Sequence, residues 1–302
     1  MHDAVALAAA LDAQRPAARG PARGDGAAPG TSGRRAVVMT MGALHDGHLS
    51  LVQHARGLAE HVVVTVFVNP LQFGAGEDLD RYPRDLPGDL AALAPLLADD
   101  DVVYAPSARD MYPDGPPRVR VAAGPVGDVL EGAVRPGHFD GMLTVVLKLL
   151  HRTAPDVAVF GAKDAQQVAL VRAMVHDLDS PVEVVEVPTV RESDGLARSS
   201  RNAYLSPVDR QRAAGLWRAL VAGREAASAG ARASQVVAAA RHVLDAAVDA
   251  VDYVALVDDA FAPVPDDAWG PARLVLAGRF GTTRLIDNAE LVLGVRGSRD
   301  TP

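Results

Sequence analysis

The 302-residue chain contains no cysteine. This absence excludes disulfide bonds, thiolate zinc sites and a cysteine nucleophile, and it is consistent with a reducing, cytoplasmic location. Long apolar runs are also missing, because stretches such as Val62–Val68 are far shorter than the ~20 residues that a membrane-spanning helix needs. No basic segment precedes the apolar N-terminus, so we expect neither a signal peptide nor a membrane partner.

An excess of positive charge is missing as well. The formal net charge is -8 and no Lys/Arg-rich block occurs, so nucleic acid is not an expected partner. A Gly-x4-Gly-Lys-Ser/Thr stretch is absent, which excludes an ordinary P-loop for ATP. A local cluster of Arg, Lys and His can still bind a small anion.

The length predicts two domains of unequal size behind an N-terminal segment. Residues 1–34 are predicted to be a flexible segment, dispensable for stability and activity. Within it Asp3–Gln14 has the composition of a short helix, whereas Arg15–Arg35 is rich in Ala, Gly, Pro and Arg and cannot bury much apolar surface.

Alternating strand and helix patterns in residues 35–189 predict an α/β fold, a parallel sheet with helices on both faces. The expected strands are Ala36–Met39, Val62–Val68, Val102–Tyr104, Val157–Phe160 and Val182–Val187. The expected helices are His48–Leu58, Leu90–Ala98, Gly141–Arg152 and Ala165–Asp177. Residues 190–302 predict a smaller α+β domain, with helices Pro207–Ala229 and Ala233–Ala246 and strands Val251–Val257, Arg273–Phe280 and Thr282–Leu285.

The segment Thr40–His48, between the first strand and the first helix, carries the strongest local signal. His45 and His48 share one face of the first helical turn, where unpaired N–H groups favour an anion. Gly47 between them lets a nucleotide approach closely. Nucleotide phosphate binding, metal binding and a purely structural capping role are the three readings that the residues leave open.

A second block, Phe67–Gly74, follows the most apolar strand, where ligands of open α/β sheets bind. Further blocks extend along the chain: Glu77–Arg84, Met111–Gly115, Leu130–Gly132, Arg135–Phe139, Gly141–Val146, Phe160–Asp164, Gln166–Gln167, Pro188–Ala197, Ser199–Asn202, Tyr204–Leu205 and Gly281–Asn288. Together with His-x-Gly-His they resemble the pantothenate synthetase family, from about Ala36 to Leu293.

The resemblance implies a Rossmann-like domain, a smaller α+β lid domain and a homodimer. It also implies a reaction: ATP and pantoate form pantoyl-adenylate and pyrophosphate, and β-alanine then displaces AMP. Two alternatives remain, another His-x-Gly-His nucleotidyltransferase and a catalytically weakened ATP-binding homologue.

The family pattern assigns substrate contacts by position. Gln72 and Gln167 match the glutamines that hold pantoate, and Met41 and Phe67 match residues around its methyl groups. A neutral amide suits a carboxylate that must stay nucleophilic. Arg135 is the expected anchor for the β-alanine carboxylate. Asn69 and Tyr82 complete the predicted substrate-binding set.

For ATP, the resemblance places His45, His48 and Lys163 on the phosphates, and Gly161 and Asp164 on the ribose. The remaining predicted nucleotide-binding residues are Met41, Gly42, Val190, Ser199, Ser200 and Arg201. The catalytic set is His45, His48, Lys163, Ser199, Ser200 and Arg201. Mg²⁺ is expected with ATP, held by phosphate oxygens and water, with Asp89 as the candidate protein ligand.

Four residues depart from the family pattern: Met39, Ala162, Ala165 and Arg198. Arg198 replaces the methionine before Ser-Ser-Arg, which backs adenine in the family. A long charged side chain seeks water unless a partner is fixed beside it. We therefore expect Arg198 to point outward.

Overall fold

The computed structural model describes residues 1–14, 31–74 and 76–294. The chain forms two compact units: unit 1 is Met1–Gly161 with Leu170–Val187, and unit 2 is Ala162–Ala169 with Pro188–Pro302. The sequence analysis placed residues 162–169 in the first domain. They belong to unit 2 because Asn288, far along the chain, hydrogen-bonds the carbonyl oxygens of Ala162 and Lys163 at 2.8 and 2.9 Å.

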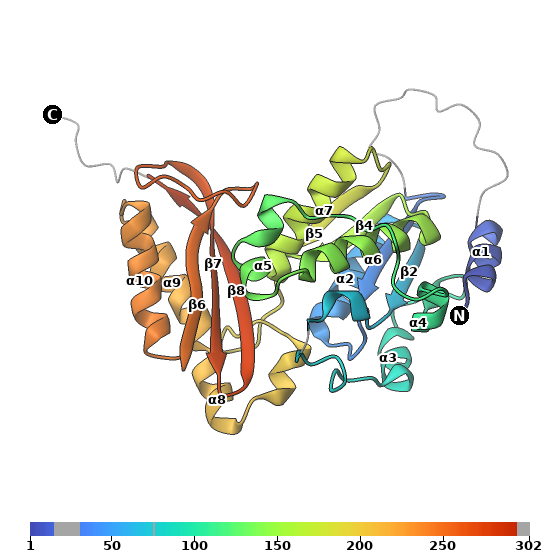
Figure 1. Cartoon of the computed structure of the whole chain (residues 1–302), viewed down its shortest axis with the longest axis horizontal. Helices are drawn as coiled ribbons and strands as arrows, with labels where there is room; N and C mark the ends of the chain where they lie inside the picture. Colours follow the sequence, from blue (N-terminus) through green and yellow to red (C-terminus); the bar gives the residue numbers. More distant parts are fainter. Residues whose placement is uncertain (15–30, 75, 295–302) are drawn as a thin grey trace. The chain divides into compact units, whose positions relative to one another are not determined.

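Unit 1 contains a five-stranded sheet in the order β3-β2-β1-β4-β5, and every described pair is parallel (Figure 1). Its strands are β1 (Arg35–Thr40), β2 (His61–Val66), β3 (Val102–Tyr104), β4 (Val157–Gly161) and β5 (Glu183–Val187). The predicted parallel α/β fold is confirmed. Strand β1 lies in the middle, and its inner residues Ala36, Val37 and Val38 are apolar and fully buried, as expected for a strand covered on both faces.

The helices of unit 1 cover this sheet. They are α1 (Ala4–Ala13), α2 (Asp46–Leu58), α3 (Leu86–Leu93), α4 (Ala108–Met111), α5 (Glu131–Val134) and α6 (His138–Thr153), with 3-10 turns η1 (Pro70–Gln72) and η2 (Pro125–Asp128). Helix α2 packs Leu51, Val52 and Ala55 against Val38 and its neighbours in one buried cluster. Among the described helices, none is long and apolar enough to cross a membrane.

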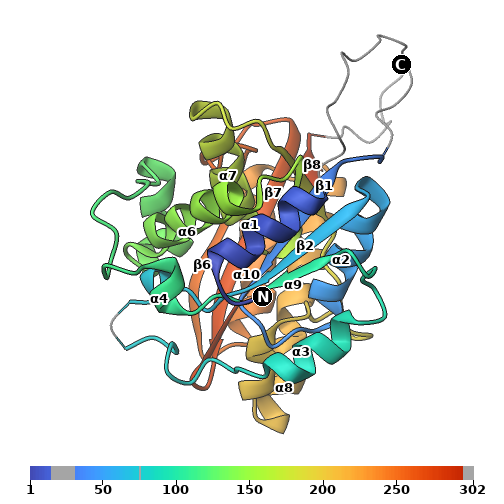
Figure 2. The same cartoon turned by 90° about the vertical axis from the view of Figure 1, so that its right-hand side faces the viewer.

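Residues 1–14 correct the prediction of a flexible N-terminal segment. The expected helix is present as α1, capped by the Asp3 carboxylate, which accepts the Ala6 N–H. Its residues Leu7 and Leu11 are buried, and α1 contacts α6 and β3 (Figure 2). The buried Arg35 guanidinium donates to the Leu11 carbonyl at 2.8 Å and to Gln14 at 3.0 Å. Residues 15–30 lie outside the described ranges.

We expect the double substitution Leu7→Ala and Leu11→Ala to destabilise the protein by several kcal/mol, because each buried leucine contributes about 1.5–3 kcal/mol. Urea-induced unfolding measures the change. The matched control is Val5→Ala on the same helix, whose side chain is 81% exposed, with an expected change within about 0.5 kcal/mol. Equal stability of the double variant and the control would show that α1 does not hold the fold.

Unit 2 combines helices with an antiparallel sheet in the order β6-β7-β8. Its elements are η3 (Ala162–Asp164), η4 (Ser200–Tyr204), α8 (Pro207–Ala213), α9 (Gly215–Ser228), α10 (Ala233–Asp245), β6 (Ala250–Val257), β7 (Gly270–Phe280) and β8 (Thr283–Leu293). Helix α7 (Ala165–Asp177) begins in unit 2 and ends in unit 1. Helices α9 and α10 pack together and share one apolar core with the sheet.

Two details of unit 2 differ from the prediction. The expected single helix 207–229 is two helices, α8 and α9, separated at Ala214. The last strand is longer than the expected 282–285, because β8 pairs with β7 along its whole length, from Phe280↔Thr283 to Gly270↔Leu293. This ladder supplies backbone partners that the local pattern of β8 does not reveal.

Candidate active site

The loop between β1 and α2 is held by a buried carboxylate. Asp89 of α3 accepts the Ala43 N–H at 3.2 Å and the Leu44 N–H at 2.7 Å. Gly42 has φ +83°, and a Cβ there would lie 2.9 Å from the Asp89 carboxylate and 3.2 Å from Val66. Both the backbone angle and the lack of space require glycine at this point.

This geometry does not favour the magnesium role predicted for Asp89. Each of its carboxylate oxygens already accepts a backbone N–H, and the side chain is buried. Asp89 therefore acts in this structure as the support of the loop that leads to His45.

His45 and His48 lie together at the N-terminus of α2. The three-residue spacing predicted that both side chains lie on one face of this turn, and their rings stack with centroids 4.0 Å apart. His45 is the N-cap residue, and its Nδ1 accepts the Gly47 N–H at 3.1 Å. A neutral ring whose Nδ1 accepts carries its proton on Nε2, so His45 presents an N–H donor beyond the cap. This pair can bind an anion.

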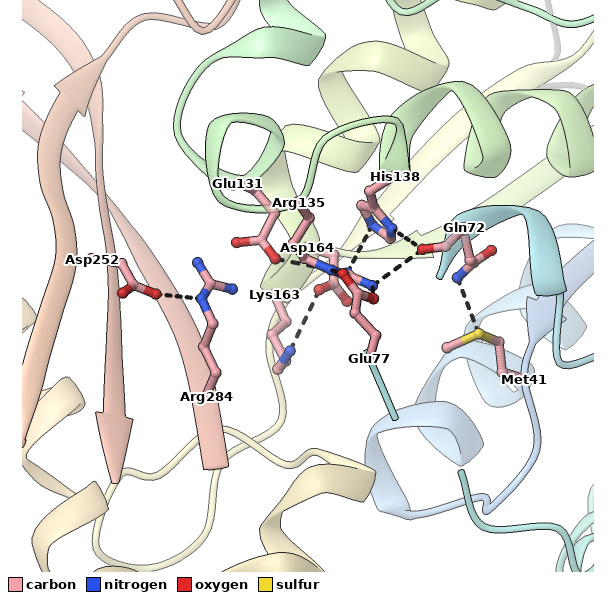
Figure 3. Close-up of polar contacts among 10 residues, drawn as sticks. All are labelled: Met41, Gln72, Glu77, Glu131, Arg135, His138, Lys163, Asp164, Asp252 and Arg284. Atoms are coloured by element: carbon pink, nitrogen blue, oxygen red, sulfur yellow. Dashed lines mark hydrogen bonds and ion pairs between the residues drawn. The ribbon is translucent and has the colours of Figure 1, made fainter. Parts of the chain in front are cut away.

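Gln72 occupies the end of η1 with its amide fixed on both sides. Its Nε2 lies 3.1 Å from the Met41 sulfur (Figure 3). Its Oε1 accepts an N–H from Asn69 at 3.0 Å. The structure thus brings the predicted pantoate residues Met41 and Gln72 together. Phe67, the residue that follows β2, is buried. Its ring centroid lies 6.1 Å from that of Tyr112.

Asn69, predicted to contact substrate, forms its side-chain hydrogen bonds with other residues of unit 1 in this structure. Its amide N–H groups donate to Gln72 Oε1 and to the Gly141 carbonyl, and its Oδ1 accepts from the Leu71 N–H and the Tyr112 hydroxyl. These four bonds use the full capacity of a primary amide. Asn69 therefore holds Gln72 and has no group left for a substrate.

Arg135 is also engaged in a way that the sequence did not reveal. Its guanidinium forms a two-point ion pair with Glu77, with Nε to Oε1 at 3.0 Å and Nη2 to Oε2 at 2.5 Å. This arrangement does not favour the predicted anchoring of the β-alanine carboxylate, because Glu77 occupies the fork that a second carboxylate would need. Tyr82, the other predicted residue of this chamber, is buried with its ring 6.0 Å from Phe73.

In unit 2 the predicted phosphate-binding lysine stands in the short turn η3. Lys163 Nζ lies 3.4 Å from the Asp164 carboxylate, so these two predicted nucleotide residues are close. Asn288 of β8 fixes the backbone of the turn by donating to the carbonyls of Ala162 and Lys163. Gln167 lies in the first turn of α7, and Gly161 is the last residue of β4.

A buried ion pair next to Asn288 in the sequence holds the Asn288 backbone in place. Arg191 donates to both oxygens of Asp287, at 2.6 and 3.0 Å, and Asp287 also accepts the Asn288 N–H. The guanidinium lies over the Trp217 ring at 4.1 Å. Burial raises the pKa of the Asp287 carboxyl, and the Arg191 charge opposes that rise. In the sequence analysis Arg191, Asp287 and Asn288 were parts of motifs without a role, and Trp217 belonged to an expected helix.

The segment Ser199–Arg201, which is predicted to bind the nucleotide, follows a tight hairpin. The Arg198 N–H donates to the Val190 carbonyl at 2.9 Å, and Arg191 forms a bridge with Ala197. Ser199 then caps η4 by accepting the Arg201 N–H, so Ser199, Ser200 and Arg201 form one turn. The Arg198 side chain is partly exposed, 4.0 Å from Glu192.

Comparison with known proteins decides the family. The Pantoate-beta-alanine ligase family model matches residues 25–290. The chain belongs to the pantoate–β-alanine ligase family. It is 56% identical to pantothenate synthetase 4 of Frankia alni, over 96% of this chain and 93% of that protein. It is 52% identical to pantothenate synthetase of Streptomyces avermitilis, over 87% of this chain and 94% of that protein.

Solved structures agree with this pantoate–β-alanine ligase membership. Pantothenate synthetase from Thermus thermophilus superposes with a TM-score of 0.84 at 46% identity, covering 96% of this chain and 98% of that one. Pantoate-beta-alanine ligase from Francisella tularensis, complexed with beta-gamma ATP and beta-alanine, gives 0.70 at 35% identity, covering 85% and 89%. The chain is therefore an enzyme that ligates pantoate and β-alanine, which excludes the alternative of another His-x-Gly-His nucleotidyltransferase.

One departure from the ligase pattern is harmless to the geometry described. Ala162 contributes its carbonyl oxygen to Asn288, and any residue has that group. For Met39, which pairs with Thr65 in the sheet register, and for Ala165, buried at the start of α7, the contacts suggest no functional consequence.

Proposed function

We propose that this ligase works in two steps through pantoyl-adenylate. The pantoate carboxylate attacks the α-phosphorus of ATP, the bond to the β-phosphate oxygen breaks, and pyrophosphate leaves. The neutral amine of β-alanine then attacks the acyl carbon, AMP leaves, and the amine loses its proton. Family membership supports the overall reaction, and the Francisella relative, complexed with beta-gamma ATP and beta-alanine, supports these two substrates.

The observation that carries the proposal is the stacked histidine pair at the α2 N-terminus. Two N–H donors and a positive helix end suit the negative charge of ATP phosphates. Lys163 and Arg201 would add cationic charge to the same phosphates, with Ser199 and Ser200 as hydroxyl donors. Stabilising charge on the departing pyrophosphate is electrostatic work.

Pantoate would be held by Gln72 and Gln167, with Met41 and Phe67 against its methyl groups. The fixed amide of Gln72, beside Met41, supports this role. Neutral amides orient the carboxylate without locking it in an ion pair, so it stays nucleophilic. Alignment of that carboxylate with the α-phosphorus would supply much of the rate acceleration.

The nucleotide's other contacts and the assembly follow from the family resemblance. Gly161 and Asp164 would face the ribose, and Gly42 and Val190 would border the nucleotide. Mg²⁺ would be bound mainly by phosphate oxygens and water. A homodimer and a cytoplasmic location remain predictions of the same kind.

The direct test is incubation with ATP, D-pantoate, β-alanine and Mg²⁺, following AMP and pyrophosphate. Omission of β-alanine should leave one equivalent of pyrophosphate per active site and bound pantoyl-adenylate. Pyrophosphate release that requires β-alanine would contradict the two-step order. No AMP under any condition would support the remaining alternative, a weakened ATP-binding homologue.

Arg198→Met should leave the KM for ATP unchanged or lower it, with equal or better kcat. The Arg198 side chain is partly exposed beside Glu192, so we expect it to give adenine no apolar contact. A methionine at this position would supply that contact. Steady-state kinetics at two salt concentrations measure the effect. A large rise in the KM for ATP, with stronger salt sensitivity in the parent, would show that Arg198 binds phosphate.

A further inference from the structure

Gln72 is held at its backbone as well as at its amide. Its carbonyl oxygen accepts from His138 Nδ1 at 2.8 Å and from Arg135 Nη2 at 3.2 Å (Figure 3). Helix α6 approaches η1 so closely that a Cβ on Gly141 would lie 2.0 Å from the Leu71 carbonyl oxygen. The N-terminal turn of α6 therefore packs tightly against η1, which carries the residue proposed to bind pantoate.

The Arg135 guanidinium links the first residue of α6, His138, to Glu77 in the segment after η1. Glu77 accepts from Nε and Nη2. On the other side Nη1 lies 3.1 Å from His138 Nε2 and 3.8 Å from Glu131. Both Arg135 and Glu77 are mostly shielded from solvent, where a two-point ion pair is strong and directional.

The protonation state of His138 fits this chain of contacts. A carbonyl oxygen cannot donate, so Nδ1 carries the proton toward Gln72 and Nε2 accepts from Arg135. Burial, and next the charge of Arg135, lower the pKa of His138 to about 4, against the opposite influence of Glu131 and Glu77. The ring is therefore neutral near pH 7. It bridges the Arg135 guanidinium and the Gln72 carbonyl oxygen, so the positions of these two groups are coupled.

We propose that Glu77, Arg135 and His138 are positioning residues for the pantoate subsite, fixing Gln72 through its backbone. This inference rests on the proposed role of Gln72. None of the three touches substrate in this scheme. Their contribution is to keep the Gln72 amide in one orientation before pantoate arrives, which lowers the ordering cost of binding.

Breaking these contacts should therefore weaken the binding of pantoate. We expect Glu77→Gln to raise the KM for pantoate about tenfold, with kcat and the KM for ATP and for β-alanine each within about twofold. Glu77→Asp should recover part of the loss, because it keeps the charge. The matched control is Glu183→Gln, which removes the exposed ion pair with Arg34 in the same unit and should leave all constants unchanged.

A double-mutant cycle separates positioning from general damage. If Glu77 acts through Gln72, the double variant Glu77→Gln with Gln72→Ala should bind pantoate no worse than Gln72→Ala alone. Additive losses would overturn the proposal. So would a selective rise in the KM for β-alanine in Arg135→Lys, which would restore direct anchoring by Arg135. An unchanged KM for pantoate in Gln72→Ala would instead refute the proposed function of Gln72, a distinguishable failure.

Discussion

Alanine at His45 or at His48 will lower the single-turnover rate of pantoyl-adenylate formation by on the order of 10²-fold or more. In the proposed mechanism each ring supplies a donor at the N-terminus of α2, where charge on the transferring phosphates would be stabilised. Rapid-quench measurement of pyrophosphate release with ATP and pantoate gives the rate. The double variant should cost less than the product of the single effects, because the rings stack at 4.0 Å.

His54→Ala provides the control on the same helix. His54 is exposed, and its Nδ1 contacts only the backbone of Ser50 among the hydrogen bonds described for it. We expect the rate of the parent. If His45→Ala and His48→Ala also keep the parent rate, the assignment of these histidines to ATP is wrong.

Asp287→Ala will destabilise the fold by about 3–5 kcal/mol, the usual cost of removing one partner of a buried pair. The Asp287 side chain is fully buried, and its loss leaves the Arg191 guanidinium without the two-point partner it has in the parent. Urea unfolding measures the change. Because Asn288 loses its neighbour's support, the KM for ATP should rise in the folded fraction as well.

Glu290→Ala is the matched control on the same strand. It pairs with Arg273, and its own side chain is 76% exposed, so its removal leaves no buried carboxylate site behind and we expect a change of about 0–1 kcal/mol. Equal losses in the two variants would mean that the Asp287 pair is no more important than a surface contact.

The predicted strands of unit 1 were confirmed within a few residues, because short runs rich in valine favour a strand through a local property, the fit of β-branched side chains to a pleated backbone. The break between α8 and α9 at Ala214 left no such mark, since alanine suits a helix on either side of it. The length of β8 was missed for a different reason: its backbone partners come from β7.

Site prediction was weakest where a side chain has a partner distant in sequence. Arg135 was assigned to β-alanine because a free guanidinium suits a carboxylate, yet Glu77 meets it first. Asn69 was assigned to substrate, and its four hydrogen bonds are all internal. Residue type predicts the chemistry of a partner and cannot say whether that partner is a ligand or another part of the chain.

The sequence alone determined the parallel α/β core and the placement of His45 and His48 on one face of a helical turn, because both follow from patterns of residues a few positions apart. Its ordered motifs also determined the family. Tertiary structure decided that α1 is part of the fold, that Asp89 supports the loop at Gly42, and that Arg135 contacts Gln72. These outcomes depend on which buried polar groups meet across long stretches of chain. Burial makes each such group find a partner, and only the folded arrangement selects which one.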